Sequence, residues 1–173
     1  LFAVIADSEH HTIKVLDLHN MSETIVAGTG SPGYLEGVGA GAAFAFPSGV
    51  EVSDDGKWAL IADTGNNRIR RLDLGTMETS LIAGPGLAGA SPGTDGVGSS
   101  ATLSRPNRIS ILPGGTWAAL ADTAADRIRL LSLDGEQAYL QGSGFQFCTQ
   151  CPANWHSKTP GSLSCQQCES NTY

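Results

Sequence analysis

The stretch FPSGVEVSDDGKWALIADTGNNRIRRLDLGTMETSLIAG, residues 46–84, decides the fold of this 173-residue chain. Turn-forming residues divide it into four short segments, each apolar or alternating between apolar and polar residues, at 49–53, 58–62, 68–74 and 77–83. The dividing sequences, Asp-Asp-Gly and Asp-Thr-Gly-Asn-Asn, contain the residues that tight turns between antiparallel strands require. The stretch therefore predicts four strands in series.

The same pattern occurs three times along the chain. The segment ADTGNNRIRRLDL at 62–74 is matched by ADTAADRIRLLSL at 121–133 and by ADSEHHTIKVLDL at 6–18, and the aspartates of successive segments lie 56 and 59 residues apart. Apolar residues occupy consecutive positions in the predicted strands, so both faces of each sheet are expected to be covered by neighbours. Four-stranded units repeated at this spacing are typical of β-propeller blades.

A few residues of the second unit point to a family. The aromatic residue Phe44 precedes Pro-Ser-Gly-Val, and the Ala-Asp turn at Asp63 is followed by Asn66 and Arg68 and later by an Ala-Gly exit. With these residues the unit resembles the NHL repeat, and the resemblance covers about residues 1–142. It implies an all-β fold, a partial β-propeller of four-stranded NHL-type blades, and a complete ring of about six blades.

The turn residues that the resemblance carries over to this chain are expected to be structural: Asp7, Asp63, Asn66, Arg68, Asp122 and Arg127. The first unit departs from the pattern because it has Thr12 where the second has Arg68, and the third has Ala-Ala-Asp in place of Gly-Asn-Asn. Hairpin turns by themselves require Asp, Asn and Gly at these places. No catalytic or calcium-binding role is therefore predicted for them.

The repeat also predicts the domain organisation. A partial blade is expected at 1–36, complete blades at 37–95 and 96–144, and a separate cysteine-rich module at 145–173. Roughly four to eight blades are needed to close a propeller ring. We therefore expect the chain to be part of a longer polypeptide, with a ring completed by another chain as the alternative.

The net charge of the chain indicates whether a nucleic acid is an expected partner. The net charge is −7, and residues 1–144 hold 16 acidic against 9 basic residues. Some NHL propellers bind RNA, which requires a basic face; here the arginines are expected to be strand-edge and turn residues that pair with Asp63, Asp73, Asp122 and Asp126. No nucleic-acid partner is predicted, and no apolar run is long enough for membrane insertion.

The end of the chain has a different composition, because all four cysteines lie there: Cys148, Cys151, Cys165 and Cys168. A segment this short cannot bury a stable core without covalent or metal cross-links. The spacing C-x2-C-x13-C-x2-C is close to that of a zinc ribbon, and disulfides are the alternative. A short internal repeat, and the lack of a Gly after the second Cys or of basic residues nearby, favour disulfides and an extracellular location.

The cysteine segment has a resemblance of its own. Cys151-Pro152, the following Gly161 and the pair Cys165 and Cys168 resemble the cysteine-rich repeat of ephrin-receptor-like and tumour-necrosis-factor-receptor-like ectodomains. That resemblance implies a Cys151–Cys165 disulfide, with Cys148 and Cys168 paired to each other or to cysteines outside this sequence.

An extracellular location also agrees with a glycosylation signal. Asn20-Met21-Ser22 is an N-glycosylation sequon, and it falls in a predicted turn between strands. Asn20 is therefore a predicted glycosylation site.

No catalytic or metal-binding constellation is recognised in the sequence. None of the four histidines recurs at equivalent positions of the three units, and the glycine-rich segment 37–41 has no following Lys of the kind that phosphate-binding loops carry. This segment is expected to be a loop between blades. No enzyme activity, cofactor or metal is predicted.

Together these features predict a non-enzymatic, extracellular interaction or structural module of a larger surface or matrix protein, active in adhesion, ligand recognition or filament building. Other proteins or glycans, and further copies in an assembly, are the expected partners, with the long glycine-rich loops at 28–44 and 84–103 as the contact surface. Two alternatives remain open: a lyase- or lactonase-type propeller enzyme with a channel metal, and an intracellular scaffold with a zinc-binding tail.

Overall fold

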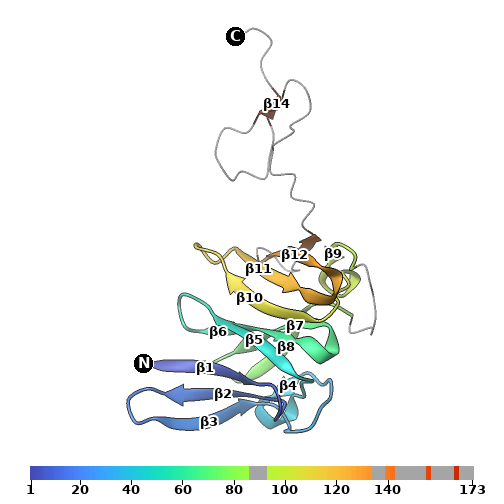
Figure 1. Cartoon of the computed structure of the whole chain (residues 1–173). Coiled ribbons are helices and arrows are strands. Elements are labelled where there is room, and N and C mark those ends of the chain that lie inside the picture. Colours follow the sequence, from blue (N-terminus) through green and yellow to red (C-terminus); the bar gives the residue numbers. More distant parts are fainter. Residues whose placement is uncertain (86–92, 134–138, 143–154, 157–165, 168–173) are drawn as a thin grey trace. The chain divides into compact units, whose positions relative to one another are not determined.

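The computed structural model describes residues 1–85, 93–133, 139–142, 155–156 and 166–167 (Figure 1). The chain divides into two compact units, Leu1–Gly142 and Ser143–Tyr173. Among the described residues, the first unit has three antiparallel sheets and the second has one short pair of strands. The predicted all-β class is confirmed.

Each sheet of the first unit is built from strands that are consecutive in the chain. The first sheet has the order β1-β2-β3, with β1 Phe2–Asp7, β2 Thr12–Asp17 and β3 Ser22–Ala27. The second has the order β4-β8-β7-β6-β5, with β4 Gly37–Val38, β5 Pro47–Val52, β6 Trp58–Asp63, β7 Arg68–Asp73 and β8 Glu78–Ala83. The third has the order β10-β11-β12-β13-β9, with β9 Gly96–Val97, β10 Pro106–Ile111, β11 Trp117–Asp122, β12 Arg127–Ser132 and β13 Tyr139–Gly142.

The glycine-rich segment 37–41 corrects one expectation. It was predicted to be only a loop between blades, but Gly37 and Val38 pair with Thr79 and Glu78 as the short strand β4 at the edge of β8. The 3-10 helix η1, Gly39–Gly41, follows directly, and the N–H of Gly39 donates to the carbonyl of Met77 over 2.9 Å. A two-residue strand has no alternation that a sequence pattern can reveal, which is why it was missed.

The hairpins that join the middle strands have a common geometry. A 3-10 helix, η2 at Thr64–Asn66, follows β6, and its equivalent η4 at Thr123–Ala125 follows β11. The next residue is left-handed in both, with φ of 55° at Asn67 and 51° at Asp126. Asn and Asp tolerate this conformation better than most residues, so the turn sequence matches the backbone that it forms.

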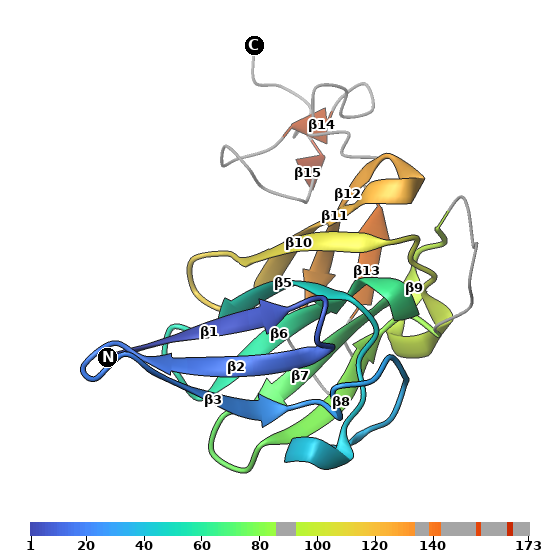
Figure 2. The same ribbon diagram turned by 60° about the horizontal axis from the view of Figure 1, so that its bottom comes forward.

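Figure 2 shows the three sheets of the first unit one beside the next. The apolar core between them consists of two clusters. Between the first and second sheets the buried side chains include Ile13, Val26, Phe44, Ile61 and Leu72. Between the second and third sheets they include Leu60, Ile69, Leu103, Leu120 and Leu131. The neighbours Leu60 and Ile61 thus point to opposite clusters, and the second sheet is covered on both faces. This is the packing of successive propeller blades.

In the second unit the structure describes the strands β14, Trp155–His156, and β15, Gln166–Gln167, which pair antiparallel. The cysteines lie outside the described residues, so their predicted disulfides stay predictions.

Candidate functional site

The second and third sheets each contain a buried ion pair. Asp63 Oδ2 lies 3.3 Å from Arg70 Nη1, and Asp122 Oδ2 lies 3.1 Å from Arg129 Nη1. All four side chains are fully buried, with 0% exposure. Removing charges from water is costly, so such a pair persists only when further hydrogen bonds complete it.

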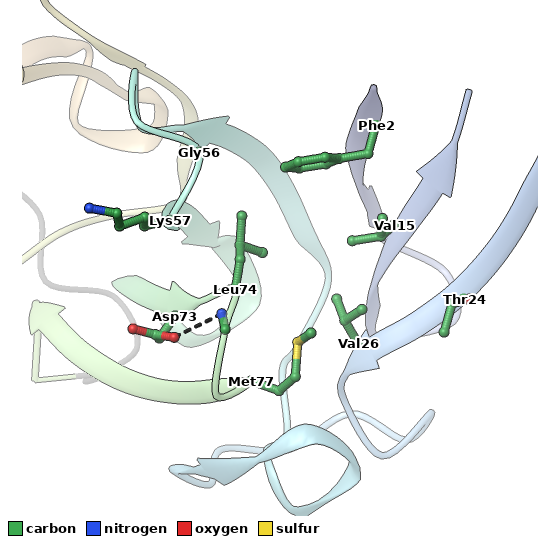
Figure 3. A pocket seen from close by; sticks show the side chains of 10 residues that line it. Phe2, Val15, Thr24, Val26, Gly56, Lys57, Asp73, Leu74 and Met77 are labelled. Carbon is green, nitrogen blue, oxygen red and sulfur yellow. Dashed lines mark hydrogen bonds between the residues drawn. The ribbon is translucent and has the colours of Figure 1, made fainter. Parts of the chain in front are cut away.

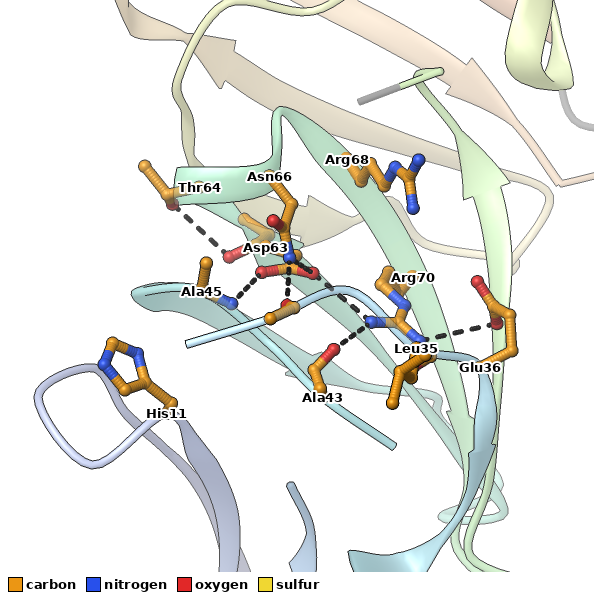
Figure 4. A network of polar contacts seen from close by, with 12 residues as sticks. His11, Leu35, Glu36, Ala43, Ala45, Asp63, Thr64, Asn66, Arg68 and Arg70 are labelled. Atoms are coloured by element: carbon orange, nitrogen blue, oxygen red, sulfur yellow. Dashed lines mark hydrogen bonds and ion pairs between the residues drawn. The ribbon is translucent and has the colours of Figure 1, made fainter. Parts of the chain in front are cut away.

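In the second sheet, Arg70 also bonds with the loop that leads into its own sheet (Figure 4). Arg70 donates from Nη1 to the carbonyl of Ala43 over 2.7 Å and from Nη2 to that of Leu35 over 2.6 Å. Arg70 Nη2 also lies 3.5 Å from Glu36 Oε2. One guanidinium therefore holds two distant points of the loop 28–44.

The third sheet repeats this arrangement. Arg129 donates from Nη1 to the carbonyl of Thr102 over 2.9 Å and from Nη2 to that of Thr94 over 2.8 Å, and it also bonds Asp95 Oδ1 at 2.8 Å. Because the contacts recur in register, they belong to the repeat and not to a site peculiar to one blade.

The aspartate of the pair holds the same loop from its other end. Asp63 Oδ1 accepts the N–H of Ala45 over 2.8 Å, while Oδ2 accepts from Asn66 Nδ2 over 2.8 Å. Burial raises the pKa of Asp63 above its ordinary value, against the opposing effect of Asn66, the Ala45 N–H and Arg70. This carboxylate is a structural acceptor enclosed by protein atoms.

Two further side chains of the β6–β7 hairpin contact the loop 28–44. Asn66 Nδ2 donates to the carbonyl of Gly33 over 2.8 Å. The guanidinium carbon of Arg68 lies 2.9 Å from the ring centroid of Tyr34, and its Nη2 donates to the carbonyl of Pro85 over 2.8 Å. The loop is therefore held by hydrogen bonds, an ion pair and a cation–π contact.

Although its backbone is held, this loop leaves apolar side chains in solvent. Tyr34 is 46% exposed, Leu35 57% and Val38 59%. We name these three residues the loop patch. Large exposed apolar groups on a fixed backbone are typical of surfaces that bind a partner.

The first sheet carries an acid and a base at the equivalent positions, Asp7 and Lys14, but this pair is only partly buried. Asp7 Oδ2 lies 2.6 Å from Lys14 Nζ, and Asp7 Oδ1 lies 2.9 Å from His10 Nδ1. The side chains of Asp7 and Lys14 are 19% and 22% exposed. The hydrogen bonds from Lys14 and then His10 lower the pKa of Asp7 from 3.8 to about 2.

Side chains in the hairpin turns also join one sheet to the next. His11 Nδ1 accepts the N–H of Phe46 over 3.1 Å, and the two rings meet edge to face at 4.6 Å. At the equivalent place Asn67 Oδ1 accepts the N–H of Arg105 over 2.7 Å. His11 thus links the first two sheets.

Two other residues singled out from the sequence, Arg127 and Asn20, lie outside the buried ion pairs. Arg127 donates to the carbonyl of Gly93 over 2.8 Å. Asn20 is exposed in the turn between β2 and β3, where its Oδ1 accepts the N–H of Ser22 over 3.0 Å. Its glycosylation stays a prediction.

The expected pairing of arginines with Asp63 and Asp122 is confirmed at Arg70 and Arg129. What sequence reasoning missed is their burial, since the arginines are expected to be strand-edge or turn residues and both of these are fully buried. Asp73, expected to pair with an arginine, accepts the N–H groups of Gly75 and Thr76. The signal was present in the sequence, since a cation follows the turn aspartate by seven positions in all three units, as Lys14, Arg70 and Arg129.

Neither a metal centre nor a membrane-spanning helix is found in the part of the chain that the structure describes. Among the described residues no group of three or more His, Cys, Asp or Glu side chains could hold a metal ion. Within the same part of the chain, no helix has both the length and the apolar character needed to cross a bilayer.

Comparison with known sequences agrees with the repeat assignment. No family model matches the chain. It is 29% identical over 128 residues to the human NHL repeat-containing protein 2, across 69% of this chain and 17% of that protein. It is 37% identical over 90 residues to the Arabidopsis thaliana protein SUPPRESSOR OF QUENCHING 1, chloroplastic, across 52% of this chain and 8% of that protein. The chain thus spans less than a fifth of the length of these relatives.

Solved structures share the fold. A protein of unknown function from Bacteroides thetaiotaomicron matches 81% of this chain and 32% of its own with a TM-score of 0.64 and 20% identity. An auxiliary nutrient binding protein from Bacteroides ovatus matches 82% of this chain and 35% of its own with a TM-score of 0.59 and 17% identity. At these identities the likeness concerns the fold alone. Repeat, sheet order and comparisons together show successive blades of a β-propeller, whose repeat is similar to that of NHL repeat-containing protein 2.

Proposed function

We propose that this chain is the non-enzymatic, extracellular interaction part of a larger surface or matrix protein, and that its propeller blades bind other proteins or glycans. The observation that carries the proposal is the loop patch of Tyr34, Leu35 and Val38, which is exposed while its backbone is fixed.

The energetic argument rests on the order of the loop before binding. Association loses affinity whenever a mobile loop must be ordered in the complex. Here Asn66, Arg68 and Arg70 already hold the loop by contacts with Gly33, Tyr34 and Leu35. Because the loop backbone is already ordered, little of its conformational entropy would be lost when a partner binds the patch.

The charged groups of the hairpins support binding over catalysis. Asp63 and Arg70 are fully buried; the carboxylate oxygens of Asp63 and the two Nη atoms of Arg70 bond to each other, to Asn66 or to the backbone of the segment 35–45. A general acid or base must reach a substrate, as must a group that stabilises charge in the transition state. These side chains act on the loop instead.

The extracellular part of the proposal rests on the sequence. The four cysteines after residue 147 and the sequon at Asn20 both suit an oxidising, glycosylating route. In this proposal the cysteine-rich segment continues the propeller as a disulfide-linked module, suited to a stalk, a filament or a matrix.

The binding claim is tested with the labelled full chain on an array of extracellular proteins and glycans. For each saturable hit, the affinity of the triple variant Tyr34→Ser, Leu35→Ser, Val38→Ser is compared with that of Ile25→Ser. Ile25 is a matched control because it is 58% exposed on β3 and is not part of the loop patch. We expect at least a tenfold loss for the triple variant only. If the hits bind the triple variant with undiminished affinity, the loop patch is not the binding surface.

The compartment is tested separately, by alkylating the secreted chain without reduction and measuring its mass. Disulfides at Cys151 and Cys165, and at the other two cysteines, leave no thiol to alkylate. Four alkylated thiols would contradict the extracellular assignment and favour the zinc-binding tail.

A further inference from the structure

An apolar pocket of about 590 Å3 lies between the first and second sheets (Figure 3). Phe2, Val15 and Val26 of the first sheet line one side, and Leu74 and Met77 at the end of β7 and in the turn before β8 line the other. The loop patch contributes no residue to this lining.

The repeat explains why space is open at this place. The positions of Phe2 and Val15 in the first sheet correspond to Trp58 and Arg71 in the second. There the guanidinium carbon of Arg71 lies 4.9 Å from the Trp58 ring centroid, and Trp58 packs against the cluster between the second and third sheets. Phe and Val are smaller than Trp and Arg, so the corresponding volume between the first two sheets is left open.

The charged residues of the lining indicate whether a ligand of this pocket would be charged or neutral. The two charged residues of the lining are Lys57 and Asp73, and Figure 3 shows both head groups directed away from the apolar side chains. Lys57 Nζ lies 3.3 Å from Asp55 Oδ2. Asp73 Oδ1 accepts the N–H groups of Thr76 and Gly75 over 2.8 and 2.9 Å, and these bonds lower the pKa of Asp73. A charged ligand would therefore lose its hydration without gaining a partner.

Met77 gives this site an adaptable wall. Its φ of 60° is left-handed, an uncommon conformation outside glycine that here turns the chain into β8. The unbranched thioether side chain can adopt several rotamers and contact either flat or branched apolar groups. The turn requires the left-handed φ, which Gly or Asn adopts more readily, but it does not require the thioether side chain.

We propose that this pocket binds a neutral, apolar small molecule whose body packs between Phe2, Val15 and Val26 on one side and Leu74 and Met77 on the other. The volume lies within the range of about 300–1,000 Å3 that small-molecule sites occupy. The site is distinct from the proposed protein- or glycan-binding surface and does not depend on it.

The test is a fluorescence titration of the full chain with the neutral dye N-phenyl-1-naphthylamine. We expect saturable binding of one dye per chain. Val15→Arg places at this position the residue that the second sheet carries at its equivalent, and it should weaken binding at least tenfold. Ile25→Arg adds the same charge at an exposed position of β3 and should leave binding unchanged.

A further variant keeps the test decisive. Val15→Phe fills the pocket without a charge and should weaken binding to a similar extent, so the outcome does not depend on whether Val15→Arg folds. No saturable binding, or binding that both Val15 variants leave intact in chains with a parent-like circular dichroism spectrum, would overturn the proposal.

Discussion

The first and second sheets carry an acid and a base at the same two places, yet the structure uses them differently. In the second sheet Asp63 and Arg70 are fully buried and hold the loop 28–44. In the first, Asp7 and Lys14 remain partly exposed and bond His10 and Glu23. The position of a charge pair in a repeat therefore does not determine its energy, which depends on what covers the pair.

The largest effect is expected for Arg70→Ala. This change leaves the Asp63 carboxylate buried without its cation and should lower the free energy of unfolding by about 3–5 kcal/mol. Urea denaturation of the full chain measures it. Lys14→Ala is the matched variant in the first sheet. Because Lys14 is partly exposed to solvent, the urea denaturation midpoint of this variant should shift far less. Equal shifts for the two variants would show that burial does not separate the two pairs.

A smaller effect is expected for the link between the second and third sheets. Asn67→Gly preserves the left-handed turn but removes the acceptor for the N–H of Arg105, which should cost about 1–2 kcal/mol. Asp126→Gly makes the same backbone change at the equivalent exposed position of the third sheet, so its unfolding midpoint should stay near that of the parent. If both variants lose the same stability, the cost lies in the turn and not in the inter-sheet bond.

The two aspartates should also respond to acid in opposite ways. The pKa of Asp7 is lowered from 3.8 to about 2 in the folded chain, so its contribution to stability is present above about pH 4 and is lost as the pH falls toward 2. Burial raises the pKa of Asp63, so its titration favours the folded chain at low pH and this contribution is lost as the pH rises through the raised value.

NMR titration of the carboxyl carbons tests this contrast. Asp7 should titrate near pH 2 and Asp63 above 3.8. In Lys14→Ala the midpoint of Asp7 should move upward while that of Asp63 stays in place. An Asp7 midpoint that is insensitive to loss of Lys14 would remove the ion pair as its cause.

The smallest structural effect is expected for Asn20→Gln. Asn20 is exposed in the turn between β2 and β3, so the change should leave the unfolding midpoint unaltered. In chain secreted from eukaryotic cells it should abolish a glycosidase-sensitive mass that Ser31→Ala, a neighbouring control, retains. A parent chain without that mass would show that the sequon is not used.

The strands illustrate how far sequence reasoning reaches. The four main strands of the second sheet were predicted within about two residues, because alternation and turn residues are local signals. The edge strand β4 at Gly37–Val38 was not, since its identity depends on pairing with β8, forty residues later in the chain. The buried role of Arg70 was missed for the same kind of reason, because its partners at Leu35 and Ala43 are distant in sequence.

By itself the sequence determined that the chain is a repeat of small antiparallel sheets with apolar residues on both faces. Hydrophobic period, turn chemistry and the spacing of the three aspartates are properties of the chain read locally. Only the tertiary structure decided which charges are buried, which loop they hold and where the first two sheets leave a pocket. These depend on the distances between side chains from different strands, and those distances are set by packing.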